Sequence, residues 1–439
     1  MKNVEVNDLR SALELLESIP GQLVETDVEV DPNAELSGVY RHVGAGGTVE
    51  RPVKPVVIPN EQAKCQEVVH LATEEGFDIR KLLPAPTNTP EDAGPYITLG
   101  MCYASNPKTG ESDVTIHRMC LQSKDEISIF LMPGARHIGY FRELAETAGE
   151  PLPISVSIGV DPAIEIASCF EPPTTLLGYD ELQAAGAIRK KPVELVQCLT
   201  INERAIANAE YVIEGEILPN VRVREDQNSN TGKAMPEFPG YCGPANPELP
   251  IIKVKAITTR KNPIMQTCIG PSEEHVSMAG IPTEASILAM VDKALPGKCL
   301  NVYNASFGGG KYVTIMQFKK TMPSDEGRQR QAALLAFSAF AELKHVILVD
   351  EDVDIFDIND VMWAMTTRFQ ADVDLITIPG VQCHPLDPSN NPAYHPGIRE
   401  RGVACKAIFD CTVPFDQKDR FQRAQFMDVD PKHWLPDMF

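Results

Sequence analysis

The middle of the chain, from about residue 96 to residue 270, consists largely of short β-branched or alternating segments. Typical examples are 114–116, 154–158 and 251–257, and turns rich in Pro, Gly, Asn and Asp separate them. Regularly spaced short strands of this kind predict an antiparallel barrel or sandwich. A largely antiparallel β-structure is therefore the expected centre of the molecule.

The segment before it has the pattern of a small α/β domain. Apolar residues recur at helical spacing from Leu9 to Ile19 and predict a short amphipathic helix. Asp8 immediately precedes them and is the expected N-cap. Two short β-like runs follow. Proline-rich stretches at 52–59 and 84–95 then bracket a small helical piece.

The last third of the chain alternates strand and helix. Ser324 is expected to cap a helix that ends near Lys344. The apolar run 346–349 has the composition of a buried strand. Asp357 or Asn359 then begins another helix. This order predicts an α/β domain.

We therefore expect a multidomain protein of the α+β and α/β classes. Its predicted parts are an N-terminal α/β domain over 1–92, a barrel domain over 93–290 and a C-terminal α/β domain over 291–439. A chain of 439 residues is long enough to give each part its own core.

Charge and cysteine usage exclude some classes of protein. The net charge is −21, from 61 acidic and 40 basic residues, so the surface repels a nucleic-acid backbone. Eleven cysteines form no Cys-x-x-Cys pair, which argues against a structural zinc site and for reduced thiols. No apolar run is long enough to span a membrane, and no secretory signal is visible. A cytoplasmic protein is expected.

Residues 113–118, Asp-Val-Thr-Ile-His-Arg, carry unusual chemistry for a strand. Alternation puts Asp113, Thr115 and His117 on one face and Arg118 on the other. Five strand steps span roughly 16 Å, enough to separate a metal-bound phosphate from a reacting carboxylate. The alternative interpretation is an exposed strand with scattered charges.

Further candidate groups lie in turns. His137 follows Arg136 in a Pro/Gly turn, where the two could bind metal and phosphate, or lie on the surface. Glu181, taken alone, is a surface carboxylate. Glu237 lies among prolines and aromatics, where desolvation would raise its pKa as a proton donor requires; the alternative is a carboxylate that faces solvent.

Three stretches imitate known motifs without meeting their spacing. Gly308–Lys311 lacks the first glycine and the final Ser or Thr of a phosphate-binding loop. Asp350, Asp352 and Asp354 resemble a calcium loop, but its turn glycine and closing glutamate are replaced. The glycines at 44–47 do not complete a dinucleotide fingerprint.

Several long strings together resemble the UbiD family of (de)carboxylases, and most closely its protocatechuate (3,4-dihydroxybenzoate) and gallate decarboxylase branch. These strings occur in order at 25–27, 31–41, 83–90, 113–118, 235–241, 270–275, 349–357 and 409–414. The resemblance implies that 93–290 is a split β-barrel that binds prenylated FMN, with a divalent metal (Mn²⁺ or Mg²⁺) and K⁺. It also implies homo-oligomers, dimers or hexamers, through the C-terminal domain, and a flavin prenyltransferase as cofactor supplier.

The same resemblance assigns roles to residues. It implies that Asp113, His137 and Glu181 bind the metal. Arg118 would hold the substrate carboxylate and Glu237 would donate the proton. The other implied positions are Thr115, Arg136 and Lys406 at the cofactor, with Lys406 at its phosphate, and His275, Lys311 and His384 around the phenolic hydroxyls.

Two features depart from the family pattern. The first acid of an acid–arginine–acid trio is either Glu225 or Asp226. Relatives also carry an additional strand and helix where Arg51-Pro52 runs almost directly into Lys54. The shortening is expected to weaken the N-terminal domain or to leave the cofactor site more open.

The expected activity is the reversible, non-oxidative decarboxylation of a hydroxylated benzoate, protocatechuate or gallate. One rival interpretation is a flavin-dependent oxidoreductase on the same barrel, which no dinucleotide motif supports. The other is a catalytically silent cofactor-binding subunit, which the missing segment makes conceivable.

Overall fold

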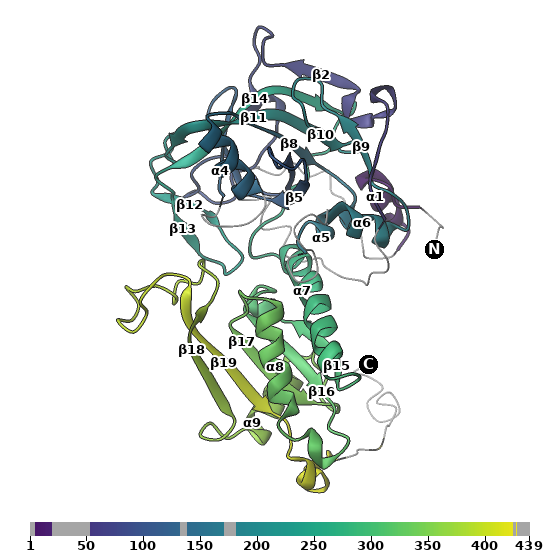
Figure 1. Cartoon of the computed structure of the whole chain (residues 1–439), viewed down its shortest axis with the longest axis vertical. Coiled ribbons are helices and arrows are strands. Elements are labelled where there is room, and N and C mark those ends of the chain that lie inside the picture. Colours follow the sequence, from purple (N-terminus) through teal and green to yellow (C-terminus); the bar gives the residue numbers. More distant parts are fainter. Residues whose placement is uncertain (1–4, 20–52, 132–137, 171–180, 425–426, 428–439) are drawn as a thin grey trace, which may run out of the picture.

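A curled, antiparallel sheet forms the centre of the first half of the molecule (Figure 1). The computed structural model describes residues 5–19, 53–131, 138–170, 181–424 and 427. The strands follow the order β3-β6-β7-β14-β11-β8-β4-β5, and β2 also pairs with β14. They are β2 (Val68–Leu71), β3 (Tyr96–Ile97), β4 (Gly100–Ser105), β5 (Ser112–Ile116), β6 (Met119–Leu121), β7 (Glu126–Ile129), β8 (Leu152–Ile158), β11 (Tyr211–Val223) and β14 (Leu249–Thr259). The predicted antiparallel centre is confirmed as a half-barrel.

Side-chain alternation and one bulge shape this sheet. Apolar residues such as Ile127, Ile154 and Ile213 are fully buried under α4 (Ile138–Ala148) and form one core. The register of β11 against β14 shifts at Gly215. A Cβ there would lie 2.6 Å from Ile252, so only glycine allows the strands this close.

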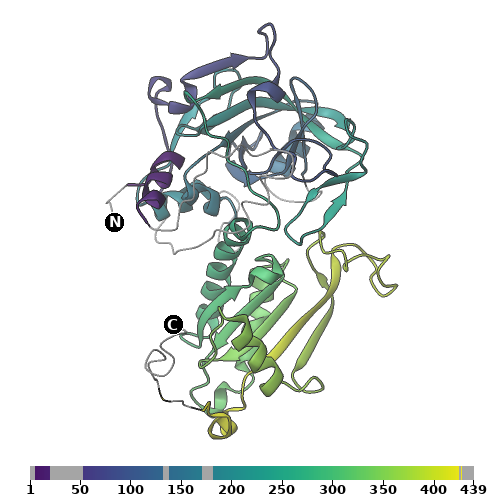
Figure 2. The same ribbon diagram turned by 180° about the vertical axis from the view of Figure 1, so that it is seen from behind.

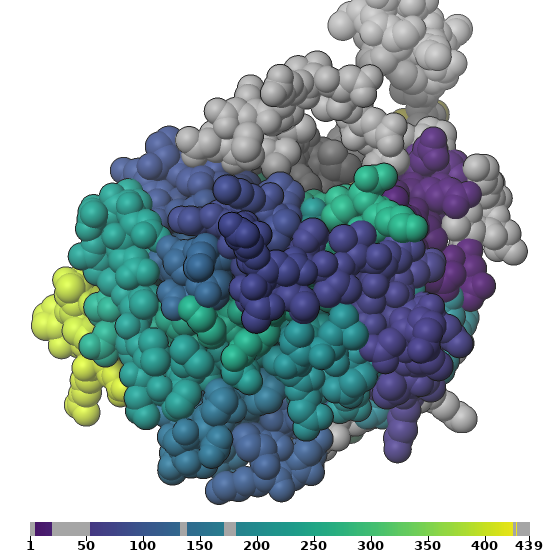
Figure 3. All heavy atoms as spheres, turned by 90° about the horizontal axis from the view of Figure 1, so that it is seen from above, coloured from purple at the N-terminus to yellow at the C-terminus, as the bar shows by residue number. Residues whose placement is uncertain are grey.

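Strands within the described residues of 1–92 pair with strands of this half. β1 (Val56–Val57) pairs with β9 (Glu194–Gln197), which pairs with β10 (Arg204–Ile206), while β2 belongs to the large sheet. Seen from above, segments coloured blue-purple and teal lie side by side over one face (Figure 3). Strand pairing with distant segments thus decides the place of β1 and β2, and the domain bounds of 1–92 stay a prediction.

Short helices complete the first half. They are α1 (Leu9–Glu17), η1 (Asn60–Gln62), η2 (Lys64–Gln66), α3 (Ile79–Leu82), α5 (Pro162–Ala167) and α6 (Glu181–Arg189). The Asp8 cap of α1 is confirmed, since its carboxylate accepts from the Ser11 N–H at 2.9 Å. Asp8 also binds Arg260 of the half-barrel at 2.6 Å, and Arg10 binds Glu210 at 2.9 Å. These ion pairs fasten α1 to the sheet.

The second half is an α/β domain around a five-stranded sheet. The strands, in the order β15-β16-β17-β19-β18, are β15 (Cys299–Asn304), β16 (Val313–Phe318), β17 (His345–Asp350), β18 (Leu375–Gln382) and β19 (Val403–Cys411). The helical segments are α7 (Glu273–Ala294), η3 (Ser306–Gly308), η4 (Pro323–Asp325), α8 (Arg328–Ala339), α9 (Ile358–Arg368) and η5 (Phe415–Phe421). α7 and α8 cover one face of the sheet and α9 the other (Figures 1 and 2).

Three details of this half refine the sequence predictions. Ser324 does not cap a helix: it lies in η4, and α8 begins after Gly327. Asp357 caps α9 and accepts from the Asn359 N–H, which settles that alternative. The buried strand predicted at 346–349 is β17.

The two halves meet along α7 and a hairpin of β12 (Lys233–Pro236) and β13 (Cys242–Pro244) (Figure 1). α7 packs against α5 of the first half and against β15 and α8 of the second. The change from one half to the other thus falls at the start of α7, earlier than the expected boundary at 290. All eleven cysteines are free thiols and eight are buried, as expected. Among the described residues, no helix is long and apolar enough to cross a membrane.

Candidate active site

Arg118 is held between two carboxylates directly after β5. Its Nε and Nη2 donate to both oxygens of Glu225, at 2.9 and 3.0 Å, and its Nη1 donates to Glu237 at 2.5 Å. The guanidinium also lies over the ring of Phe130, 4.3 Å from the centroid. Burial disfavours its charge, but Glu237 and Glu225 together raise the pKa of Arg118 above its ordinary value. Arg118 is therefore a permanently charged, fixed anion receptor.

Glu225, and not Asp226, is the first acid of this trio. The Tyr96 hydroxyl donates to Glu225 Oε1 at 3.0 Å, and the Asn246 N–H donates to Oε2 at 2.9 Å. Asp226 points elsewhere and pairs with Arg224 at 2.8 Å. Glu225 is 1% exposed and has four donors, so it serves as a rigid support for Arg118.

Glu237 lies in the turn between β12 and β13. Its backbone N–H donates to the Tyr241 carbonyl at 3.1 Å, and Gly270 packs directly against its backbone. The side chain is 18% exposed. The interpretation of Glu237 as a solvent-facing turn carboxylate is thus excluded. Arg118 binds the carboxylate, as an acid–arginine–acid trio requires, and the role of Glu237 as proton donor stays a prediction.

Two of the three predicted metal ligands are buried carboxylates on adjoining elements. Asp113, on β5, is 3% exposed, and Glu181, the first residue of α6, is 2% exposed. α6 packs against β5. The exposed-surface alternatives for both residues are excluded. His137 and Arg136 lie outside the described residues, and the described remainder holds no group of three or more potential ligands.

The strand predicted over 113–118 ends earlier. β5 stops at Ile116, so His117 and Arg118 follow the strand and do not continue its alternation. Thr115 is hydrogen-bonded to the imidazole of His117 at 2.7 Å. The cofactor role predicted for Thr115 stays a prediction.

A second group of polar side chains surrounds Phe238, the neighbour of Glu237. The rings of His275, Tyr312 and His384 contact the Phe238 ring edge-on, with centroids 5.9, 4.9 and 4.8 Å away. The Lys311 ammonium lies 5.6 Å from the same centroid. The three residues predicted around phenolic hydroxyls are thus gathered at one aromatic side chain.

His275 presents a neutral imidazole. It lies in the first turn of α7, and its Nδ1 is 2.6 Å from the Gly270 carbonyl, which can only accept. Nδ1 therefore carries the proton and Nε2 is an acceptor. Burial first, and then Lys311, lowers the pKa of His275 to about 4.

Glu342 joins the other two members of this group. Its Oε2 accepts from Lys311 Nζ at 3.3 Å and lies 3.2 Å from Nε2 of His384. The sequence offered no signal for Glu342, which lies in an irregular loop between α8 and β17. Phe238 and Tyr312 were also missed, although each is next to a predicted residue.

Lys406, which the resemblance places at a cofactor phosphate, contacts a loop of the second half in this structure. It is in β19 of the second half, and its ammonium donates to the carbonyls of Ala341, at 2.7 Å, and Leu343. Burial lowers its pKa to about 8. In this structure the ammonium of Lys406 is thus bound to backbone carbonyls, and its predicted role at a cofactor phosphate stays a prediction.

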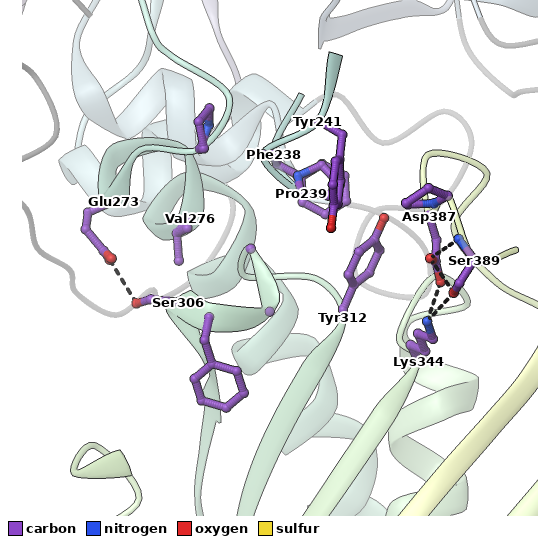
Figure 4. A pocket seen from close by; sticks show the side chains of 16 residues that line it. Phe238, Pro239, Tyr241, Glu273, Val276, Ser306, Tyr312, Lys344, Asp387 and Ser389 are labelled. Carbon is purple, nitrogen blue, oxygen red and sulfur yellow. Dashed lines mark hydrogen bonds and ion pairs between the residues drawn. The ribbon is translucent and has the colours of Figure 1, made fainter. Parts of the chain in front are cut away.

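A pocket of about 470 Å³ opens between the halves beside Phe238. Figure 4 shows the Tyr312 ring between the Phe238–Tyr241 turn and the Lys344–Asp387 ion pair. Within the part of the chain that the structure describes, the buried Tyr312 hydroxyl has no hydrogen-bond partner. Tyr312 thus lines this cleft with a hydroxyl that is itself buried.

The motif imitations have structural explanations. Asp350 and Asp352 both bind Arg368, at 3.1 and 2.6 Å, and do not form a cation loop. Gly309 adopts φ +64° under the Phe238 ring and Gly310 packs on Val276, so these glycines serve close packing. The glycines at 44–47 lie outside the described residues.

A curled half-barrel followed by an α/β domain, with an acid–arginine–acid trio in the first, defines a known class. Two family models match: the 3-octaprenyl-4-hydroxybenzoate carboxy-lyase Rift-related domain over 56–273 and the C-terminal domain of the same family over 276–411. The chain belongs to the UbiD family of carboxy-lyases.

Individual relatives are similar over almost the full length. Gallate decarboxylase of Lactiplantibacillus plantarum is 56% identical over 476 residues, covering 96% of this chain and 97% of that protein. The apo structure of a 3,4-dihydroxybenzoic acid decarboxylase from Enterobacter cloacae is 54% identical, with a TM-score of 0.91 over 99% of this chain and 100% of that one. A UbiD-class enzyme from Pelotomaculum thermopropionicum in complex with FMN is 33% identical, with a TM-score of 0.83 over 95% and 97% of the two chains.

The match to the gallate decarboxylase spans more positions than this chain has residues, 476 against 439. That relative therefore holds residues that this chain lacks. The difference agrees with a shortened segment, although Arg51-Pro52 lies outside the described residues.

Proposed function

We propose that this protein catalyses the reversible, non-oxidative decarboxylation of a hydroxylated aromatic acid, protocatechuate or gallate. The observation that carries the proposal is Arg118, held charged between Glu225 and Glu237. A fixed guanidinium beside a carboxylic acid can bind a carboxylate and supply a proton at the same place. The similarity to a gallate and a 3,4-dihydroxybenzoic acid decarboxylase supports this substrate class.

The donor set fits a metal that holds a phosphorylated flavin. Asp113 and Glu181 are buried carboxylates on adjoining elements, and hard oxygen ligands suit Mn²⁺ or Mg²⁺. His137 would complete the set, with Arg136 and Thr115 nearby and K⁺ as a second ion. Prenylated FMN, when bound, supplies the electron sink for the reaction. The half-barrel is then the flavin-binding domain.

The trio would place the proton donor beside the substrate carboxylate. Glu225 and Glu237 use three of the five N–H donors of Arg118, so one N–H on Nη1 and one on Nη2 remain for a substrate carboxylate. That carboxylate would then lie next to Glu237 on the same guanidinium. The bond between the ring and the carboxylate then breaks, CO₂ leaves, and the ring carbon takes the proton of Glu237.

The residues around Phe238 would bind the ring hydroxyls. Neutral His275 offers Nε2 as an acceptor, and Lys311 offers a charged donor. One hydroxyl can therefore donate to His275 while its neighbour accepts from Lys311. His384 completes this end of the site.

The test is turnover by protein coexpressed with a flavin prenyltransferase. We expect CO₂ release from protocatechuate or gallate, and a bound prenylated flavin by mass spectrometry. NAD(P)H oxidation would favour the flavin oxidoreductase. Full cofactor loading without CO₂ release from any hydroxybenzoate would favour a silent subunit and overturn the proposal.

A further inference from the structure

We infer that Glu342 is a positioning residue that determines specificity for two adjacent ring hydroxyls. It does so by fixing Lys311 and His384 beside Phe238. The inference rests on the proposed function and assigns to Glu342 the recognition of the substrate's hydroxylation pattern. Glu342 itself touches neither the proton donor nor the metal ligands among the described contacts.

A single carboxylate oxygen organises two side chains. Oε2 of Glu342 lies 3.3 Å from Lys311 Nζ and 3.2 Å from His384 Nε2. The Leu386 N–H donates to Nδ1 of His384 at 3.1 Å, so Nδ1 is an acceptor and Nε2 carries the proton. Both nitrogens of His384 are thereby used. In this arrangement His384 holds Glu342, and its ring packs edge-on against the rings of Phe238 and Tyr312.

Charge makes Glu342 suitable for this task. Burial opposes its charge, but Lys311 and His384 outweigh that effect and hold the pKa of Glu342 below its usual range. The anion in turn lies 3.3 Å from the Lys311 ammonium and accepts from it. An ammonium has three N–H donors, so Lys311 can bind Glu342 and still donate to a phenolic oxygen.

The loop that carries Glu342 is itself clamped. Lys406 donates to the carbonyls of Ala341 and Leu343, the residues on either side of Glu342. A flexible loop could not hold a carboxylate within hydrogen-bond distance of two partners. This contact gives the buried Lys406 a function that the sequence did not indicate.

The donor and the acceptor of the site then have a fixed spacing. His275 and Lys311 lie around the same Phe238 ring, one as a neutral acceptor and the other as a charged donor. A ring with hydroxyls on neighbouring carbons can use both, while a monohydroxylated ring uses one. Release of Lys311 from Glu342 should therefore remove the preference for the dihydroxylated ring.

The experiment compares Glu342→Gln with wild type on protocatechuate, 4-hydroxybenzoate and catechol. We expect the KM for protocatechuate to rise about tenfold or more, the effect of losing a charge-assisted hydrogen bond. We expect kcat to change much less, and the preference over 4-hydroxybenzoate to fall by a similar factor. Binding of catechol to the cofactor-free protein, measured by calorimetry, should weaken in parallel.

Two further variants make the result specific. Glu351→Gln removes a carboxylate from a half-exposed ion pair with Lys418 and should change none of these values. Glu342→Asp keeps the charge on a shorter side chain, so its KM for protocatechuate should lie between those of wild type and Glu342→Gln. If Glu342→Gln does not fold, Glu342→Asp takes its place in the comparison with wild type. An unchanged KM and unchanged catechol binding in Glu342→Gln would overturn the inference. If the wild-type protein binds catechol but shows no turnover, the proposed function is contradicted. The comparison of catechol binding between wild type and Glu342→Gln would then still test the role of Glu342.

Discussion

At the scale of single residues, the site depends on how many donors each carboxylate receives. Glu225 accepts from Arg118 twice, from Tyr96 and from Asn246, and is almost fully buried. Glu237 accepts from Arg118, and its side chain is partly exposed. The two acids of the trio are therefore unequal: Glu225 is a fixed, buried support, whereas Glu237 is partly exposed and accepts from Arg118 alone among the side-chain contacts described above.

Glu237→Gln tests this inequality. The amide keeps the shape but cannot deliver a proton, so we expect kcat to fall by about 10²- to 10⁴-fold, the usual contribution of a general acid. The flavin content, read from the absorbance of purified protein, should stay at the wild-type level. Glu248→Gln, an exposed position of the same segment, is the matched control. Activity retained in Glu237→Gln would remove it from the donor role.

Tyr96→Phe tests the support of Glu225. The change removes one hydroxyl that donates at 3.0 Å and leaves the buried ring in place. Losing a hydrogen bond to a charged group should cost about 1.5 to 3 kcal/mol of unfolding free energy and lower kcat/KM about tenfold. Urea unfolding and initial rates measure the two effects, with Tyr140→Phe on the exposed face of α4 for comparison. Equal kcat/KM in wild type and Tyr96→Phe would show that Arg118 needs no such support.

At the scale of elements, the turn before β16 fixes the position of Phe238 relative to Lys311 and Tyr312. Gly309 has φ +64°, and a Cβ there would lie 2.5 Å from the Phe238 ring. The turn also carries Lys311 and Tyr312. Backbone conformation, packing and ring recognition thus depend on the same few residues.

Gly309→Ala and Gly297→Ala separate the backbone effect from the packing effect. Both glycines have nearly the same φ, +64° and +66°, but nothing lies within 4 Å of a Cβ at Gly297. We expect each alanine to cost about 1 kcal/mol of stability for its left-handed backbone. Only Gly309→Ala should also lower kcat/KM, because Phe238 must move. Similar activity of the two variants would show that the Phe238 contact has no role.

The sequence predicted those helices and strands that are determined by neighbouring residues. The strands of the half-barrel, the Asp8 cap and the buried β17 follow from alternation, capping and apolar runs. The attachment of β1 and β2 to distant strands could not be predicted, because pairing depends on residues more than a hundred positions away. Ser324 failed as a cap since Gly327 provides the left-handed entry to α8.

The site was predictable in its residue types and less so in its geometry. The carboxylates Asp113, Glu181 and Glu237 are buried or partly buried as a site requires. Glu225 and Asp226 are neighbours in the chain, so only the path of the backbone decides which one faces Arg118. The contacts of Lys406 could not be predicted, because no local pattern reveals that two carbonyls of a distant loop accept from its ammonium.

At the scale of the whole molecule, buried acids link stability to pH. Glu165 of α5 is fully enclosed, and burial first, and then Glu274, raises its pKa to about 8. The ordinary value, 4.5, applies to the unfolded chain. The folded protein therefore holds a proton that the unfolded chain releases between these two values. This contribution is complete below pH 4.5 and is lost as the pH rises through about 8.

Glu165→Gln should remove that dependence. In wild type we expect the unfolding free energy to fall by up to about 1.4 kcal/mol per pH unit from this group, between about pH 5 and pH 8. The variant should show a flatter profile of melting temperature against pH, while Glu75→Gln on the surface should follow wild type. A parallel decline in both variants would assign the pH effect to other groups.

The two halves supply different groups of site residues, which has a consequence for protein engineering. The trio of Arg118, Glu225 and Glu237 comes from the half-barrel, whereas His275, Lys311 and His384 come from the second half or its first helix. Phe238 is the side chain that reaches from the former to the latter. Consider a chimera with this protein's residues up to the start of α7 and the remaining residues of another family member. We expect it to have the ring specificity of that family member and the reaction chemistry of this protein, provided that the new second half accommodates Phe238.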